Sequence, residues 1–346
     1  MGDKILIGMS GGVDSSTAAL LLQQKGHQVC GCTLKLYSNE DIGLCSSRTC
    51  CSLQDVEDAR SVACRLGMDH LVFNFGDTFR QTVIEPFAQS YIRGETPNPC
   101  ILCNPSVKFK SLIDCADRLG APFVATGHYA RARDGMLFKG MPANDQSYML
   151  CRLRRDQVER MLLPLGEYEK KQVRALAEEF GIPVAHKPDS MEICFIPDKD
   201  YIGWIGRRAD LPGPGDVTLN GKVVARHEGY PRYTVGQRLP GLWHERKLYV
   251  SAIRPEKNEL VAALWDDLFK TEVRARSVNW LIDRPDEPLR GSVRVRHTKW
   301  ENPDCTVYAE GDGARIVCDT PVRAPARGQA AVIYQGDRLI AGGWIE

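Results

Sequence analysis

Short apolar runs alternate with amphipathic segments through the first half of the chain. Continuous apolar runs predict buried strands at residues 4–9, 28–36, 70–75 and 123–126. Between these runs, helical apolar spacing predicts helices at residues 15–25, 52–66, 77–93 and 108–119. Strands and helices that alternate through short connections are typical of an α/β fold with a doubly wound parallel sheet.

The pattern changes in the second half of the chain. One more helix is predicted over residues 165–189 and is interpreted as a linker. After the Pro- and Gly-rich stretch 211–215, short alternating segments favour small β structures. We therefore expect three domains: a catalytic domain with linker helices at 1–206, a small mixed β module at 207–270 and a β-barrel at 271–346.

Composition limits the classes of function. The 346 residues are 43% hydrophobic and 26% charged, which is ordinary for a folded protein. The 45 Lys and Arg residues balance 44 Asp and Glu residues, so any contact with a nucleic acid must be local. We find neither a long apolar run nor a leader peptide, and expect a cytoplasmic protein without a membrane partner.

A glycine-rich loop, Gly8-Met9-Ser10-Gly11-Gly12-Val13-Asp14-Ser15-Ser16, lies between the first predicted strand and the first helix. Glycines let the backbone approach an oligophosphate, and the helix N-terminus adds partial positive charge. Asp14 could hold Mg²⁺ or cap the helix at Ser15. The loop matches neither the kinase-type nor the dinucleotide-binding motif. Its Ser-Gly-Gly-x-Asp-Ser pattern resembles the loop of the N-type ATP pyrophosphatases, which cleave ATP between the α and β phosphates.

The 13 cysteines form an odd set that does not indicate a disulfide scaffold in a reducing compartment. Six lie among apolar residues and are predicted to be core thiols: Cys30, Cys32, Cys64, Cys115, Cys151 and Cys318. Six others lie in polar or Gly- and Pro-rich segments and are candidates for chemistry: Cys45, Cys50, Cys51, Cys100, Cys103 and Cys194.

Eight further motifs occur in a fixed order after the loop. They are Thr96–Asn104 (TPNPCILCN), Lys108-Phe109, Ala125–Tyr129 (ATGHY), Asp145–Tyr148 (DQSY), Asp189–Ile196 (DSMEICFI), Gly229–Arg238 (GYPRYTVGQR), Gly328-Gln329 and Ala341–Trp344 (AGGW). With the loop, they resemble the tRNA-specific 2-thiouridylase family over essentially the whole chain. The resemblance implies ATP-dependent conversion of the wobble uridine, position 34 of tRNA, to 2-thiouridine.

The resemblance also implies a mechanism. ATP adenylates the C2 oxygen of uridine, sulfur attacks C2, and AMP leaves. In this family pattern Cys103 is the catalytic nucleophile and Cys194 receives persulfide sulfur. The sulfur donor is either a persulfide carrier protein or hydrosulfide.

Cys100 departs from the better-known family pattern, which has an aspartate there. Cys100, Cys103 and Cys194 could together supply three soft thiolates. We therefore expect a [4Fe-4S] cluster with one open iron, with a persulfide and disulfide cycle through Cys103 and Cys194, or structural zinc, as alternatives.

Other contacts carry over by position. ATP is expected at residues 8–15, at the Leu34 backbone and at Gly127. The residues expected to contact tRNA are Asn98, Pro99, Cys100, His128, Asn144, Asp145, Gln146, Arg296, His297 and Gln329. For His128 a purely structural role is an equal alternative, and Arg296 and His297 are expected on a barrel strand.

Two further readings stay open. The segment 44–52, with its three cysteines, could relay sulfur, bind a metal or be an ordinary surface loop. The whole chain could instead be another adenylating enzyme of the same superfamily, or a non-catalytic RNA-binding protein that senses a metal or a nucleotide.

Overall fold

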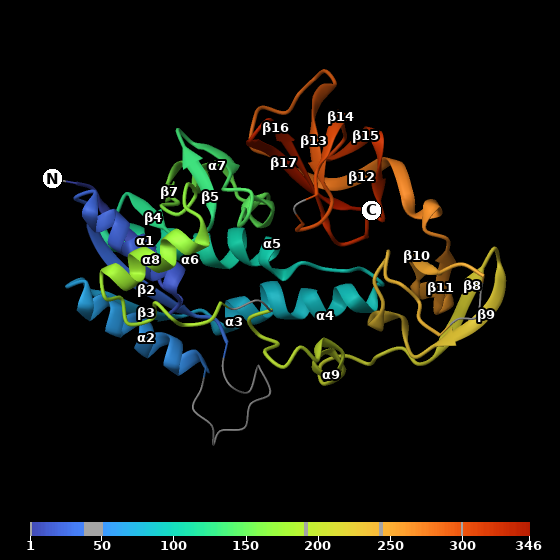
Figure 1. The fold of residues 1–346 in the computed structure, drawn as a ribbon, viewed down its shortest axis with the longest axis horizontal. Coiled ribbons are helices and arrows are strands. Elements are labelled where there is room, and N and C mark those ends of the chain that lie inside the picture. The colour runs from blue at the N-terminus through green and yellow to red at the C-terminus, as the bar shows by residue number, and fades with distance from the viewer. Residues whose placement is uncertain (1, 38–50, 190–192, 242–244, 299) are drawn as a thin grey trace. The chain divides into compact units, whose positions relative to one another are not determined.

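The computed structural model describes residues 2–37, 51–189, 193–241, 245–298 and 300–346 (Figure 1). The chain divides into two compact units. The first contains Met1–Val83, Cys100–Lys199 and Asp337–Leu339, and the second contains Ile84–Pro99, Asp200–Gly336 and Ile340–Glu346. Among the described residues, no helix combines the length and the apolar character that a membrane span requires.

A five-stranded parallel sheet forms the centre of the first unit. Its strands run in the order β3-β2-β1-β4-β7. Their bounds are β1 Lys4–Gly8, β2 Gln28–Lys35, β3 His70–Asn74, β4 Phe123–Ala125 and β7 Met161–Leu162. The chain moves from β1 to β2 and β3 and then returns to β4 on the other side of β1. The carboxyl end of β1 is therefore the topological switch point, where open α/β sheets bind ligands.

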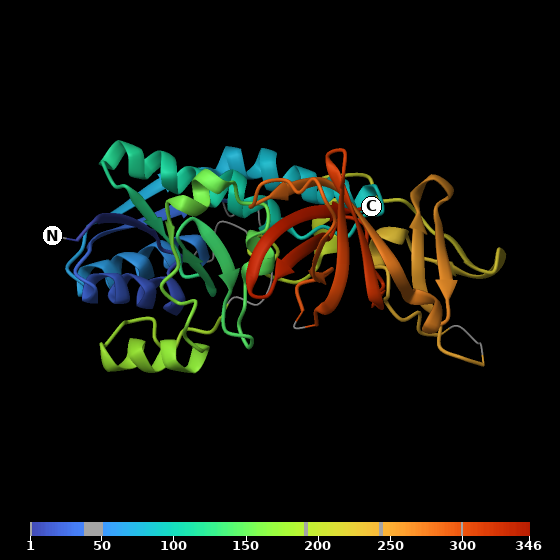
Figure 2. The ribbon, with the colours of Figure 1, turned by 90° about the horizontal axis from the view of Figure 1, so that it is seen from above.

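Helices cover both faces of this sheet. The helices of the unit are α1 Val13–Gln24, α2 Cys51–Arg65, α3 Gly76–Phe79, α5 Pro99–Cys103, α6 Phe109–Leu119, α7 Arg155–Glu159 and α8 Lys170–Glu179. Figure 2 shows α6 on one side of the sheet and α1 and α2 on the other, with α8 outside α1. A hairpin of β5 (Ala130–Arg133) and β6 (Met136–Lys139) follows β4.

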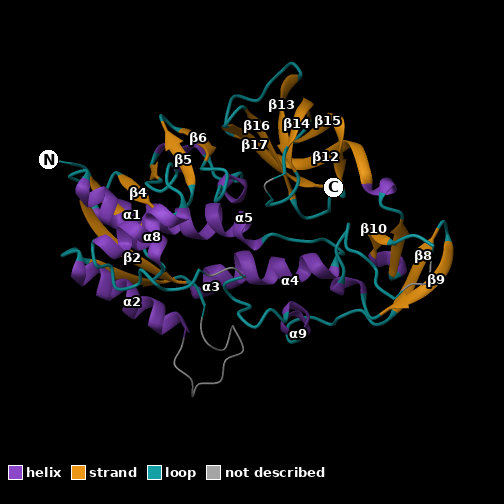
Figure 3. Ribbon diagram, in the orientation of Figure 1, coloured by secondary structure: helices purple, strands orange, loops and turns teal. Residues whose placement is uncertain are grey.

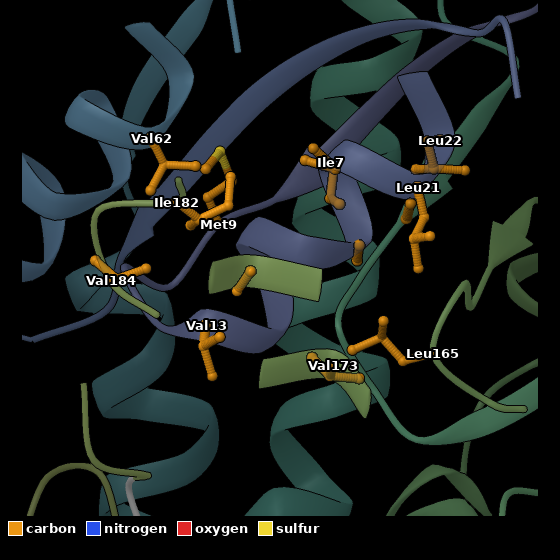
Figure 4. Packing of buried hydrophobic residues seen from close by; sticks show 14 of the residues in the cluster. Ile7, Met9, Val13, Leu21, Leu22, Val62, Leu165, Val173, Ile182 and Val184 are labelled. Carbon is orange, nitrogen blue, oxygen red and sulfur yellow. The ribbon is translucent and has the colours of Figure 1, made fainter. Parts of the chain in front are cut away.

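One apolar cluster joins the sheet to α1, α2 and α8. Ile5 and Ile7 of β1, Val62 of α2 and Val173 of α8 all belong to it. Figure 4 shows Val13 of α1 near Val173. The predicted linker helix 165–189 is therefore wrong in two respects: α8 is shorter, and it packs into the core of the first unit. Gly181, with a φ of 63°, ends the helical pattern because the left-handed conformation cannot continue a helix.

Prolines shape two segments in ways the periodicity did not show. The predicted helix 77–93 consists of α3, a π-helical turn at Arg80–Ile84 and α4 (Glu85–Ile92), because Pro86 lacks the N–H that an unbroken α-helix needs. Pro99 does not end helical structure but begins α5, since proline is favoured in the first turn. A second π-helical turn, Asn104–Lys108, joins α5 to α6.

The second unit contains two β structures (Figure 3). A mixed four-stranded sheet has the order β10-β11-β8-β9, with strands β8 Gly215–Leu219, β9 Lys222–His227, β10 Tyr249–Arg254 and β11 Glu259–Ala263. Six antiparallel strands form a barrel in the order β12-β15-β14-β13-β16-β17, which pairing of β12 with β17 closes. They are β12 Phe269–Trp280, β13 Leu289–Arg294, β14 Asn302–Glu310, β15 Gly313–Arg323, β16 Ala330–Gln335 and β17 Arg338–Ile345.

The predicted fold class is confirmed: a doubly wound parallel sheet is followed by a small mixed β module and a C-terminal β-barrel. The second unit also holds α4 and α9 (Tyr201–Gly206). Asp200 caps α9 by accepting a hydrogen bond from the backbone N–H of Gly203 at 2.9 Å.

Candidate active site

The glycine-rich loop lies at the switch point, between the end of β1 and the start of α1. Gly12 is the residue before the helix, in an extended conformation, and no side chain caps the helix start. The first backbone N–H groups of α1 are therefore available to an anion. The buried hydroxyls of Ser15 and Ser16 donate to the Gly12 carbonyl at 3.3 and 2.8 Å, so they hold the loop in shape.

Lys187 ties the loop to α2. Its Nζ donates to the Gly11 carbonyl at 3.0 Å and pairs with Asp55 at 2.7 Å and Asp58 at 2.6 Å. Burial opposes the charge on Lys187, but the two carboxylates outweigh it and raise the pKa of the ammonium above its ordinary value. Gly11 itself has a φ of 69°, and a Cβ there would lie 2.3 Å from the Asp55 carbonyl oxygen. Only glycine fits this approach of the loop to α2.

Asp14 is held by an ion pair and a hydrogen bond and does not cap α1. Both of its carboxylate oxygens accept from Lys170 Nζ at 2.7 Å, and Oδ1 also accepts from the Tyr129 hydroxyl at 2.6 Å. Lys170 pairs in addition with Asp189 at 2.7 Å, which also accepts from Arg174. A cation thus neutralises Asp14 in this structure, and its role as a Mg²⁺ ligand stays a prediction. The helix begins without the predicted cap.

The residues predicted to meet the adenine flank the loop on either side. Leu34 lies near the carboxyl end of β2, and Gly127 follows β4, the two strands that neighbour β1. Gly127 packs directly on the loop, because a Cβ there would lie 2.7 Å from the backbone nitrogen of Ser15. A nucleotide at the switch point would thus have β2 on one side and β4 on the other.

Three of the candidate cysteines gather in the same unit as the loop. Cys100 and Cys103 lie on α5, three residues apart on one helical face. Cys194 comes from a turn far along the chain, yet its thiol interacts electrostatically with both Cys103 and Cys100. Lys108, in the π-helical turn after α5, acts on all three thiols.

Burial dominates the acidity of these thiols. It raises the pKa of Cys103 to about 11, while the Lys108 charge opposes that rise. Burial, followed by the neighbouring Cys103 and Cys100, raises the pKa of Cys194 to about 12. The expectation of a thiolate in a polar loop is wrong for Cys103, which lies on a helix with 8% of its surface exposed. The sequence misled here because the flanking prolines indicate a loop but begin a helix.

The three thiols do not fit the predicted metal site. Within the described ranges, no group of three or more His, Cys, Asp or Glu side chains is arranged to hold a metal ion. The structure therefore does not support a [4Fe-4S] cluster or zinc on Cys100, Cys103 and Cys194. Spacing of two cysteines on one helix could not fix how the third, from a distant turn, approaches them.

His128, half-buried after β4, is held neutral. It stacks on Phe109, with ring centroids 5.9 Å apart, and its Nδ1 shares a 2.7 Å hydrogen bond with the Thr126 hydroxyl. Burial and then the Lys108 charge keep the pKa of His128 well below its usual value. A neutral imidazole can form hydrogen bonds with a base but cannot form an ion pair with a phosphate.

Residues 144–146, which were predicted to contact tRNA, form part of a turn that is held by hydrogen bonds. Asp145 accepts from the backbone N–H groups of Gly140 and Ser147, and Gln146 accepts from that of Tyr129 at 3.0 Å. Asn144, half-buried, donates its backbone N–H to the Met141 carbonyl. These hydrogen bonds hold the turn against the chain at Tyr129 and Gly140.

In the second unit, the remaining candidates also have structural contacts. Gln329 donates to the Thr96 carbonyl at 2.7 Å, in the segment that leads to Asn98 and Pro99. Arg296 donates to the carbonyls of Val235 and Ala324. Arg296 and exposed His297 do not lie on a barrel strand as predicted, because β13 ends at Arg294 and the chain bends after it.

The other cysteines divide between core and surface. Cys32, Cys115, Cys151 and Cys318 are buried as predicted and Cys30 is half-buried, but Cys64 is exposed. Val62 and Ala63 of α2 face the core, and Cys64 lies on the opposite side of that helix. The prediction for segment 44–52 falls on residues outside those described, apart from Cys51 and Ser52, which begin α2.

Sequence reasoning missed the cations that organise the site. Lys170 lies 156 residues from Asp14, and Lys187 lies 176 residues from Gly11. Lys108 and Tyr129 stood within recognised motifs without an assigned role. The one sequence feature that could have drawn attention to Lys187 is its place close to a recognised motif, seven residues before Cys194.

Comparisons with known proteins cover the whole chain. Family models described as a tRNA methyl transferase HUP domain, a tRNA methyl transferase PRC-barrel domain and an aminomethyltransferase beta-barrel domain match residues 3–198, 210–263 and 270–345. The protein from Paramagnetospirillum magneticum named tRNA-specific 2-thiouridylase MnmA is 43% identical over 99% of this chain and 95% of its own length. Proteins of the same name from Carboxydothermus hydrogenoformans and Clostridioides difficile are 42% and 41% identical, over 99% and 100% of this chain and 97% and 99% of their own lengths.

Proposed function

The chain belongs to the family of tRNA-specific 2-thiouridylases, and on that premise we propose that it converts uridine 34 of tRNA to 2-thiouridine at the expense of ATP. Its activity is that of a tRNA sulfurtransferase. The observation that supports this function best is that one unit holds both an anion-binding loop at the sheet's switch point and the interacting thiols Cys103 and Cys194. In this proposal the loop activates the base, and the thiols carry and release sulfur that an external donor supplies.

Activation begins at the loop. The C2 oxygen of uridine attacks the α phosphate of ATP, and pyrophosphate leaves, so that the base becomes an adenylate. The free N–H groups at the start of α1 stabilise the negative charge that develops on the phosphates. Mg²⁺ carried in with ATP would neutralise further phosphate charge. C2 is then open to attack, because AMP is a far better leaving group than an oxide.

Sulfur arrives as a persulfide on Cys194, from a persulfide carrier protein or from hydrosulfide and an oxidised thiol. The terminal sulfur attacks C2, AMP departs, and a C2–S–S–Cys194 bond remains. The Cys103 thiolate then attacks the Cys194 sulfur. The 2-thiouridine leaves with the electron pair of the broken S–S bond, and Cys103 and Cys194 are left as a disulfide, which an external thiol reductant returns to two thiols.

The Lys108 charge favours the thiolate that the last step requires. Lys108 acts on both thiols and lowers the pKa of each, against the larger effect of burial. Burial raises the pKa of both thiols, so each is protonated at neutral pH and the nearby Lys108 charge favours the thiolate of either one. Cys194 is exposed as a residue whereas Cys103 is buried, so a donor meets Cys194 first even though the Cys194 thiol itself points inward.

The test uses the full chain with a transcript tRNA, ATP and a persulfide donor. We expect equal amounts of AMP and 2-thiouridine, measured by chromatography and by mass spectrometry of nuclease digests. A matched transcript with cytidine in place of uridine 34 should give neither product. AMP formation without tRNA would indicate a different adenylating enzyme, and no ATP use at all would indicate a binding protein.

A further inference from the structure

A second pair of thiols lies in the barrel of the other unit, among residues to which the proposed reaction assigns no role. Cys305 of β14 and Cys318 of β15 are directly opposite each other in the antiparallel register. Their sulfur atoms are 3.0 Å apart. We propose that Cys305 and Cys318 are an oxidisable dithiol, which peroxide converts into a disulfide between the neighbouring barrel strands β14 and β15.

The backbone geometry suits this bond. Opposite residues on antiparallel strands have Cα atoms about 4.5 or 5.5 Å apart, and both values fall within the range of about 4.4–6.8 Å that disulfides span. The sulfur atoms are already closer than non-bonded heavy atoms normally rest, about 3.5–4.0 Å for carbon. Closure therefore needs the two sulfurs to move together by about 1 Å, without a shift in register.

The contact also gives the two thiols different pKa values. The S–H of Cys305 donates to the sulfur of Cys318. This hydrogen bond lowers the pKa of Cys318 and raises that of Cys305, because it stabilises a thiolate at Cys318 and requires the proton at Cys305. The pair can therefore supply one thiolate as the nucleophile and one protonated thiol that resolves the intermediate.

The reaction with hydrogen peroxide balances without another reactant. The Cys318 thiolate attacks one peroxide oxygen, which forms a sulfenic acid and releases hydroxide. The sulfur of Cys305 attacks the sulfenic sulfur, the S–S bond forms, and the sulfenic hydroxyl leaves as water with the Cys305 proton. The proton that Cys318 lost on becoming a thiolate neutralises the hydroxide from the first step. Two thiols and one peroxide give one disulfide and two waters.

The surroundings select a small oxidant. Cys305 is 0% and Cys318 is 3% exposed, and both belong to the apolar cluster inside the barrel with Val307 and Ile316. A bulky disulfide such as oxidised glutathione cannot reach these sulfurs without unfolding the barrel, whereas peroxide is little larger than water. The pair is therefore expected to react with peroxide in the folded protein and to resist exchange with glutathione.

The test is a peptide map of the folded full chain after treatment with hydrogen peroxide, with free thiols blocked by N-ethylmaleimide in denaturant. Trypsin cleaves after Arg315, so Cys305 and Cys318 fall in separate peptides, residues 300–315 and 316–323. We expect these two peptides joined by a disulfide that a phosphine reductant opens. The variants Cys305→Ser and Cys318→Ser should each lack the joined peptide.

Two internal controls make the outcome decisive. Cys151, fully buried in the other unit, should still be alkylated, and exposed Cys64 should report that the peroxide was active. The oxidised wild type should also melt at a higher temperature than the oxidised Cys305→Ser variant, because the cross-link restricts the unfolded chain. If Cys64 is oxidised while Cys305 and Cys318 are both still alkylated, the proposal is wrong.

Discussion

The Nζ atom of Lys187 lies 3.0 Å from the carbonyl oxygen of Gly11, although the two residues are 176 positions apart. The same ammonium pairs with Asp55 and Asp58 of α2. Three segments of the candidate site therefore meet at one cation: the glycine-rich loop, α2, and the chain that leads to Cys194. Lys187 is a positioning residue, since it holds the backbone of the loop.

Replacement of Lys187 by methionine should weaken ATP binding while the protein stays folded. The change leaves the Gly11 carbonyl and two carboxylates without their shared cation. We expect KM for ATP to rise about tenfold and the free energy of unfolding to fall by about 1–3 kcal/mol, the usual cost of a partly buried polar group that loses its partner. Steady-state AMP release and chemical denaturation measure the two effects.

Lys171 provides the matched control for that variant. Its side chain is 80% exposed and pairs with Glu169 on the surface of α8. Lys171→Met should leave KM for ATP and stability close to those of the wild type. Equal effects of Lys171→Met and Lys187→Met would show that the loop does not depend on the Lys187 contact.

Gly127→Ala should disrupt the nucleotide site through backbone contact alone. The added methyl group would lie 2.7 Å from the backbone nitrogen of Ser15, so either β4 or the start of α1 must shift. We expect at least a tenfold loss of kcat/KM for ATP and a lower Tm. Gly213→Ala is the control, because a Cβ at Gly213 meets nothing within 4 Å.

The reactivity of Cys103 should rise steadily with pH. Burial raises the pKa of this thiol to about 11, so it is protonated at neutral pH and its thiolate fraction grows about tenfold for each pH unit. Alkylation of Cys103 by iodoacetamide, followed by mass spectrometry, should accelerate through pH 10. Free cysteine, with a pKa of about 8.5, should level off earlier. A plateau for Cys103 near pH 8 would contradict the burial argument.

Lys108→Met should slow that alkylation at every pH below 10. The lysine charge lowers the pKa of Cys103 and Cys194, so its loss raises both. We expect a decrease of about threefold to tenfold, since one pKa unit corresponds to about 1.4 kcal/mol. Lys110→Met, an exposed residue that pairs with Asp114 on α6, should leave the rate unchanged. An unchanged rate in Lys108→Met would remove Lys108 from the site.

Local pattern was sufficient where the partners are neighbours in the chain. The place of the glycine-rich loop could be predicted because Gly8–Ser16, the strand before it and the helix after it are contiguous. The barrel could be predicted because alternation with period two persists through its strands. In contrast, the contacts of Lys170 and Lys187 depend on how α8 and the turns after it pack on α1 and α2, which no local spacing encodes.

Register and helix phase account for the other differences. Cys64 has apolar neighbours in the sequence, but the phase of α2 turns it away from the core. Cys318 was expected in the core, yet only the pairing of β14 with β15 places Cys305 opposite it. The same limit applies to Cys194, whose approach to α5 is a tertiary contact that the C-x-x-C spacing of Cys100 and Cys103 could not reveal.

The most direct test of the proposed mechanism is the separation of adenylation from sulfur transfer in Cys103→Ser and Cys194→Ser. Each variant is incubated, free of iron, with transcript tRNA, ATP and a persulfide donor, and AMP and 2-thiouridine are quantified from the same sample. The account predicts tRNA-dependent AMP formation without 2-thiouridine in both variants, and both products in the Cys64→Ser control. Unchanged 2-thiouridine in either variant would contradict it.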